Sequence, residues 1–112
     1  MAYTTIDDPS VYFQTTKYTG NAGVNNIVNG GNSDLQPDWV WIKNRGTSGK
    51  DHGLWDTSRG ALKQINTNNQ GAENNTANSL TAFNSDGFSL GSDGGPNANN
   101  GTHVAWQWKA NG

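Results

Sequence analysis

The apolar residues of this chain come in short alternating runs, and segments rich in Gly and Asn separate one run from the next. No long window repeats apolar residues at the three-and-four spacing of a helix. Alternation with a period of two is the pattern of a half-buried strand, and short strands joined by Gly/Asn turns are typical of sandwiches and barrels. We therefore expect an all-β fold over residues 1–112: one small antiparallel β-sandwich with few or no helices.

Two of these runs contain a W-x-W pair, so together they hold four of the five tryptophans. In residues 39–43, the alternation sets Trp39, Trp41 and Lys43 against Val40 and Ile42. Because both faces of this run begin apolar, we predict a central strand covered on both sides. Lys43 suggests that the Trp face opens toward solvent at its C-terminal end.

Residues 102–110 alternate cleanly. Val104, Trp106 and Trp108 share one face, and the opposite face carries His103, Ala105, Gln107 and Lys109. We predict that the face with the two tryptophans is the core face, since this polar chain has few other large residues with which to fill a core.

Three further segments indicate strands. Residues 11–20 place aromatic side chains among β-branched ones. Residues 79–92 are typical of a hairpin, in which Phe83 and Phe88 flank a turn that ends in Asp-Gly. Residues 58–67 fit a short helix and a strand equally well.

Composition limits the classes of function. Only 31% of the 112 residues are hydrophobic, 14% are charged, and the net charge is -2. Nucleic-acid binding needs a basic face, which such a chain lacks. No apolar run is long enough to cross a bilayer and no basic cluster could dock on an anionic one, so we expect no membrane insertion. The absence of Cys excludes disulfides and thiolate sites.

Residues that could support catalysis are sparse. No nucleophile-elbow, zinc-binding or phosphate-loop motif occurs in the sequence. His52 stands beside Asp51 and His103 lies in an expected strand, without a partner at a diagnostic spacing. We therefore expect no enzymatic activity.

Calcium is the one metal that the sequence leaves open. Oxygen ligands of the kind it takes could come from Asp7 with Asp8, or from Asp86, Asp93 and Asn97. Neither group matches a known calcium loop, and Asp and Asn in turns usually bond the nearby backbone. We expect no cofactor.

Exposed tryptophans would be the natural platform for a sugar ring. Trp55 lies in the polar, turn-rich segment "HGLWDTSRG" and is the one that we expect to be most exposed. Trp55, Trp39 and Arg59 are therefore the candidate ligand-binding residues, whereas at least three tryptophans are expected to serve as core.

The segments "YTTIDDPSVYFQT", "YTGN", "SDLQPDWVWIKNR", "LWDTSRG", "NSLTAFNSDGFSLGSD" and "HVAWQWKA" resemble a domain family of phage virion proteins, found in marine and cyanobacterial viruses and described as tail-fibre-like or lectin-like. The resemblance runs from about Tyr3 to Lys109. It implies a lectin-like sandwich of the jelly-roll type, related to concanavalin-like and SPRY-like domains, and a place on the virion. It implies no activity and no ligand residues. Relatives continue past the W-x-W-K segment into a second half, so this chain is either a short version or the first module of a longer virion protein.

The expected function is therefore structural. We expect a non-enzymatic virion protein, a tail-fibre or capsid-surface module made in the host cytoplasm and displayed on the particle. Its expected partners are other virion proteins and further copies of itself, because a small core gains from burial by neighbours. The alternative is a lectin-like module that recognises a host surface glycan during attachment.

Overall fold

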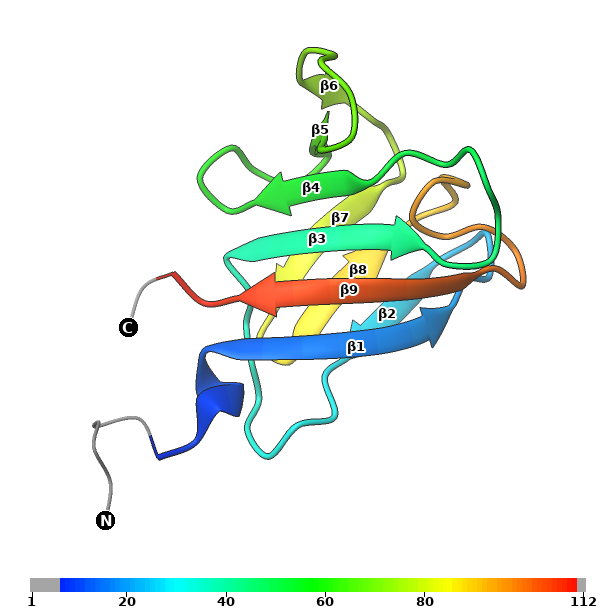
Figure 1. The fold of residues 1–112 in the computed structure, drawn as a ribbon. Coiled ribbons are helices and arrows are strands. Elements are labelled where there is room, and N and C mark those ends of the chain that lie inside the picture. Colours follow the sequence, from blue (N-terminus) through cyan, green and yellow to red (C-terminus); the bar gives the residue numbers. More distant parts are fainter. Residues whose placement is uncertain (1–6, 111–112) are drawn as a thin grey trace.

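The computed structural model describes residues 7–110, and these form two antiparallel sheets packed face to face (Figure 1). The six-stranded sheet has the order β1-β9-β3-β4-β5-β6, and the three-stranded sheet behind it has the order β2-β8-β7. The strands are β1 (Phe13–Thr19), β2 (Asn25–Val28), β3 (Trp39–Asn44), β4 (Gly53–Asp56), β5 (Lys63–Asn66), β6 (Asn74–Asn75), β7 (Leu80–Asn84), β8 (Gly87–Leu90) and β9 (Thr102–Trp108). The expectation of a small all-β sandwich is confirmed.

A single 3-10 turn, η1 (Pro9–Val11), is the one helical element among residues 7–110. It starts where Asp8 accepts a hydrogen bond from the Ser10 backbone N–H, 3.0 Å away, and Pro9 supplies the fixed φ of a first helical position. Hydrogen bonds from Ser10 and Ser33 lower the pKa of Asp8 below its ordinary value. No helix of the described residues is long and apolar enough to cross a membrane.

Several expected strands lie where the alternation put them. β3 is interior to the large sheet, between β9 and β4, so its central place is confirmed. The prediction that both of its faces are covered is wrong, because the small sheet packs only on the face of Val40 and Ile42. The hairpin is confirmed, because Phe83 of β7 pairs with Phe88 of β8 across the expected turn. In the segment 58–67, which fitted a helix and a strand equally well, the structure forms strand β5. Gly60 and Leu62 both have positive φ, 100° and 69°, and two left-handed residues so close together reverse the chain instead of letting a helix propagate.

The core lies between the two sheets and is made of a few large residues. Its members come from six strands: Ile27, Val40, Ile42, Trp55, Leu80, Phe88, Leu90 and Ala105. The prediction that the two tryptophans of β9 lie on its core face is therefore wrong. Ala105 and Gln107 are fully buried toward the small sheet, whereas Trp106 and Trp108 are half-buried on the opposite face.

A buried amide pair explains how a polar face of β9 can be the inner one. The side chains of Gln107 and Asn29 exchange two hydrogen bonds, of 3.0 and 2.7 Å. The Thr16 hydroxyl donates to Asn29 Oδ1 at 2.7 Å, and Asn29 also donates to the Leu35 carbonyl at 3.2 Å. Since buried amides are tolerated when their groups are paired, this network ties β1 and β9 to the chain that leaves β2.

Candidate functional site

Five aromatic rings from three neighbouring strands gather on the outer face of the six-stranded sheet. We call this set the tryptophan face; its members are Phe13 of β1, Trp106 and Trp108 of β9, and Trp39 and Trp41 of β3. Pairing puts Trp39 directly opposite Trp108 and Trp41 directly opposite Trp106. Phe13 stands opposite Trp108 from the other side. The small sheet covers only the inner face, so β3 and β9 are open toward the viewer in Figure 1.

The rings contact one another closely but do not share a plane. The ring centres of Trp39 and Trp108 lie 4.2 Å apart with an interplanar angle of 50°, and those of Trp41 and Trp106 lie 5.1 Å apart at 47°. Phe13 and Trp108 are 4.9 Å apart at 51°. Tilted pairs at these separations each contribute about 0.5–1.5 kcal/mol beyond their buried area. The result is a corrugated apolar surface.

Only one indole N–H of the four tryptophans has a protein partner in the described residues. Trp41 Nε1 donates to the Thr67 hydroxyl at 3.1 Å, which fixes that ring over the sheet. The N–H groups of Trp39, Trp106 and Trp108 are left for solvent or for a bound molecule. An indole that offers both an apolar ring and a donor is suited to an interface.

A hollow of about 470 Å³ opens at one end of the tryptophan face. Trp39 and Trp108 line it together with the charged residues Asp38, Asp56 and Lys109. Asp38 already accepts hydrogen bonds from the Thr57 hydroxyl, at 3.2 Å, and from a backbone N–H, at 2.9 Å. The hollow therefore places two apolar rings beside hydrogen-bond acceptors and a lysine.

Asp56 carries a negative charge at the rim of this hollow. Burial raises its pKa, but hydrogen bonds and the positive charge of Arg59 outweigh that effect and leave the pKa below its ordinary value. Arg59 Nε lies 2.7 Å from the Asp56 carboxylate. The carboxylate is therefore ionised at neutral pH and held in one orientation.

The prediction that Trp55 is the most exposed tryptophan is wrong. Its side chain is 1% exposed, belongs to the core, and donates through Nε1 to the Ser79 hydroxyl at 3.3 Å. Gly53, two residues earlier on the same face of β4, makes room for the ring, since a Cβ there would lie 2.7 Å from Trp55 Cζ3. A ring so placed offers no surface for a ligand to stack on.

Arg59, the second predicted ligand residue, ties a turn together. Its guanidinium bonds Asp56, lies 3.1 Å from Glu73 Oε1, and donates to the carbonyls of Leu54 and Lys63, both at 3.1 Å. These bonds occupy most of its donors and hold it on the β4–β5 connection. Of the three predicted residues, Trp39 alone lies on the tryptophan face.

The residues considered for calcium are not brought together. No group of three or more His, Asp or Glu side chains forms a cluster within residues 7–110. Asn97 is fully buried, and its amide bonds Asn21, Asn25 and the carbonyls of Gly23 and Gly91. Asp8 is engaged by η1, as described above. The side chains of Asp8 and Asn97 therefore serve the loops in which they stand.

His103 is the one histidine in a strand, and it is fully buried. Its ring stacks on Tyr18, with centres 5.0 Å apart and planes 7° apart, and Nδ1 lies 3.1 Å from the Gly101 carbonyl. Burial lowers the pKa of His103 below its ordinary value.

Reasoning from the sequence missed Phe13, Trp41, Trp106 and Trp108 as site residues. The signal that could have revealed them is the repeat itself. Two W-x-W strands that pair antiparallel in matching register stack their four rings on one face of the sheet.

The chain belongs to a family described as a domain of unknown function (DUF7483), whose model matches residues 8–112. No curated protein and no solved structure matches the sequence. The family description carries no activity and no ligand.

Proposed function

We propose that this member of the DUF7483 family is a non-enzymatic structural module that binds a protein partner through its tryptophan face. The observation that carries the proposal is the gathering of four of the five tryptophans on the outer face of the large sheet. A chain with so few hydrophobic residues places its largest ones where its own core does not use them. Tryptophan is enriched among the residues that dominate the energy of protein interfaces.

The tilt of the rings favours a protein over a flat ligand. Interplanar angles of 38–51° leave no common plane on which an extended sugar chain could lie. A corrugated surface instead accepts interdigitating side chains, which is how interface cores reach the packing density of protein interiors. The resemblance to phage virion proteins supports a virion protein as the partner, with the chain acting in assembly on a tail fibre or capsid surface.

The experiment is site-specific photocrosslinking on purified particles of the virus that encodes the chain. A photoreactive phenylalanine replaces Trp41 in one preparation and Ser85 in the control. Ser85 is exposed in the β7–β8 turn, away from the tryptophan face. We expect a crosslink to one virion protein from position 41 and none from position 85. Particles that lack the chain, or equal crosslinking from both positions, would contradict the proposal.

Glycan binding is the second candidate, and the hollow beside Trp39 and Trp108 is the observation that favours it. Two rings beside Asp38 and Asp56 could stack on one sugar residue and accept bonds from its hydroxyls. Titration with host surface polysaccharide would show binding that Trp39→Ala abolishes. Trp41→Ala is the matched control, because Trp41 lies on the same face but does not line the hollow. Equal losses in both variants would remove the hollow as the site.

A further inference from the structure

One side of the sandwich carries two edge strands, β1 of the large sheet and β2 of the small one (Figure 1). The two other edges are protected in ways that proteins commonly use. β6 has only two residues, and β7 is interrupted by a register shift between Leu80 and Ala82. β1, by contrast, has seven residues and pairs with β9 without a shift. It is the longest regular edge of the described molecule.

The outer edge of β1 presents unpaired backbone groups. Lys109 N–H donates to the Tyr12 carbonyl and Gly20 N–H to the Gly101 carbonyl, both at 2.8 Å, at the two ends of the β1–β9 ladder. Since bonding and non-bonding pairs alternate in an antiparallel ladder, the even-numbered residues of β1 bond β9. The N–H and C=O groups of Phe13, Thr15 and Lys17 therefore point away from the sheet, and no residue within 7–110 supplies a partner for them.

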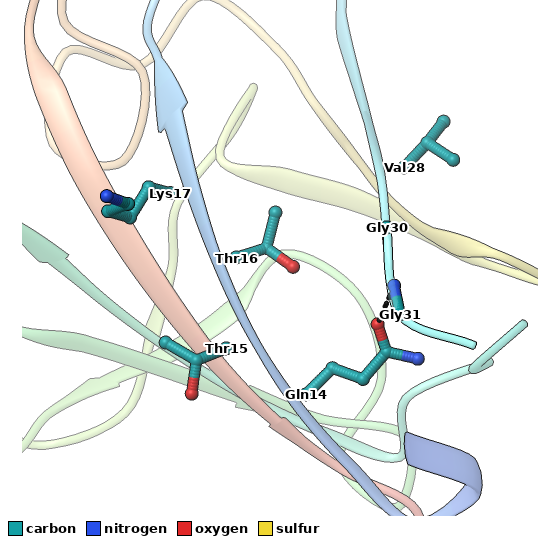
Figure 2. A pocket seen from close by; sticks show the side chains of 7 residues that line it. All are labelled: Gln14, Thr15, Thr16, Lys17, Val28, Gly30 and Gly31. Atoms are coloured by element: carbon teal, nitrogen blue, oxygen red, sulfur yellow. Dashed lines mark hydrogen bonds between the residues drawn. The ribbon is translucent and has the colours of Figure 1, made fainter. Parts of the chain in front are cut away.

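Exposed apolar side chains gather along the same side. Among the described residues, four large hydrophobic side chains are exposed: Tyr12 at 39%, Phe13 at 37%, Val24 at 81% and Val28 at 58%. All four belong to β1 or β2 or directly precede one of them. A hollow of about 590 Å³ runs along this edge, between β1 and the chain from Val28 to Gly31. Figure 2 shows Gln14 and Thr16 pointing toward the hollow, and Thr15 and Lys17 on the other face of β1.

We propose that β1 pairs antiparallel with β1 of a second copy of this chain, about a two-fold axis at Thr15. Phe13 then pairs with Lys17 of the second copy, and Thr15 with its own counterpart. Each of these pairs exchanges two backbone hydrogen bonds, which satisfies the outward N–H and C=O groups of Phe13, Thr15 and Lys17. A two-fold interface is self-complementary in this way, because the same surface serves both partners.

The pairing of Lys17 with Phe13 selects this register over its neighbours. An axis at Gln14 or Thr16 also pairs odd-numbered residues, but it sets Lys17 opposite Val11 or Thr15 and forms no pair between Phe13 and Lys17. A two-fold axis at Lys17 would set two lysines directly opposite each other, which destabilises a strand pair. An axis at Phe13 would leave Thr15 and Lys17 opposite the η1 segment, where regular pairing ends. With the axis at Thr15, the Lys17 ammonium lies over the ring of Phe13 and beside Trp108, a cation–π arrangement. The sequence of the edge therefore favours a second copy as the occupant.

This inference does not rest on the proposed function. It does, however, fix how two tryptophan faces would be placed, because the two-fold axis is perpendicular to the sheet. The two six-stranded sheets become one continuous sheet, and both tryptophan faces lie on the same side of it. A dimer of this kind would present two adjacent binding surfaces, and binding at both would exceed the affinity of either one.

The first test is the self-association of the full chain, measured by sedimentation equilibrium over the micromolar range. We expect a monomer–dimer equilibrium. Phe13→Lys and Phe13→Glu both remove the ring, but the first places like charges opposite Lys17 and the second places opposite charges there. The dissociation constant of the Phe13→Lys dimer should be at least about tenfold higher than that of the Phe13→Glu dimer. Added salt should reduce this difference between the two constants. Circular dichroism checks that both variants are folded.

The second test uses the absence of cysteine in the chain. Antiparallel bonded pairs have Cα atoms about 5.5 Å apart, within the range of a disulfide. Thr15→Cys should therefore form a disulfide-linked dimer in a glutathione buffer, whereas Thr19→Cys, the control on the same face of β1, should not. A monomer at every concentration, equal dissociation constants for the two Phe13 variants, or crosslinking from position 19 and not from position 15 would each overturn the proposal.

Discussion

Gly53 and Trp55 form a contact whose energy can be isolated by a double-mutant cycle. They lie two residues apart on the inner face of β4, and Trp55 is the one tryptophan of the core. A methyl group at position 53 would overlap Cη2 of the Trp55 ring and lie 2.7 Å from Cζ3. These two atoms belong to the six-membered ring of the indole, which extends beyond the reach of a phenylalanine side chain.

The expected magnitude follows from two opposing effects. Overpacking a core by one methyl costs about 1–3 kcal/mol, and replacing Gly by Ala returns about 0.4–1 kcal/mol by restricting the unfolded chain. Gly53→Ala should therefore lower the free energy of unfolding by about 1–2 kcal/mol. In a Trp55→Phe background the overlap is gone, so the same change should be neutral or slightly stabilising. The coupling energy should be about 2 kcal/mol.

The assay is urea unfolding followed by far-ultraviolet circular dichroism on all four chains. With an m-value of about 2 kcal/mol per molar urea, Gly53→Ala should lower the midpoint by about 0.5–1 M. The m-value should be unchanged, because the folded state buries the same surface. An equal cost of Gly53→Ala in both backgrounds would refute the reasoning, since it would mean that the Trp55 ring does not fill the space beside Gly53.

Three further outcomes are expected. Burial lowers the pKa of His103 in the folded state, so below the ordinary histidine pKa of about 6.5 the unfolded chain binds more protons than the folded one. The contribution of His103 to stability should therefore be full above that pH and fall as the pH drops toward the folded pKa. Urea midpoints should decrease with falling pH in this range, and they should no longer do so in His103→Phe. Asn29→Ala removes hydrogen-bond partners of the buried Gln107 amide and should lower the free energy of unfolding by about 1–3 kcal/mol. Calorimetry should show that the double variant Asn29→Ala, Gln107→Leu recovers part of this loss. Arg59→Met should lower the unfolding free energy by about 1–2 kcal/mol through the loosened β4–β5 turn, while calorimetric titration shows that the affinity for a protein bound at the tryptophan face is unchanged.

The strands could be predicted because alternation and turn chemistry are local properties. The hairpin around residues 84–87, the central place of β3 and the strand character of β9 all follow from neighbouring residues. Alternation separates the two faces of a strand, but it does not tell which face is inside. In β9 the tryptophans favoured one face, while the amide pair of Gln107 with Asn29 decides for the other. That partner is far away in sequence, so the energy that sets the direction is not local.

The candidate site shows the same limit. Trp55 stands among polar residues, which favoured exposure, yet Gly53 on the same strand face opens the space that buries it. A Gly two residues before a Trp in a strand is a signal that could have been used. Arg59 resembled a binding group because a guanidinium suits many ligands. Its actual partners, Asp56 and Glu73 together with two carbonyls, come from both sides of a turn whose shape the sequence does not state.

The tryptophan face also has an optical consequence. Indoles whose centres lie 4.2 and 5.1 Å apart are close enough for their electronic transitions to couple and for excitation to pass between them. The tryptophan face holds four of the five tryptophans, so it should absorb most of the near-ultraviolet light that this protein takes up. Solvent quenching of the emission from the tryptophan face should weaken when a bound molecule covers it.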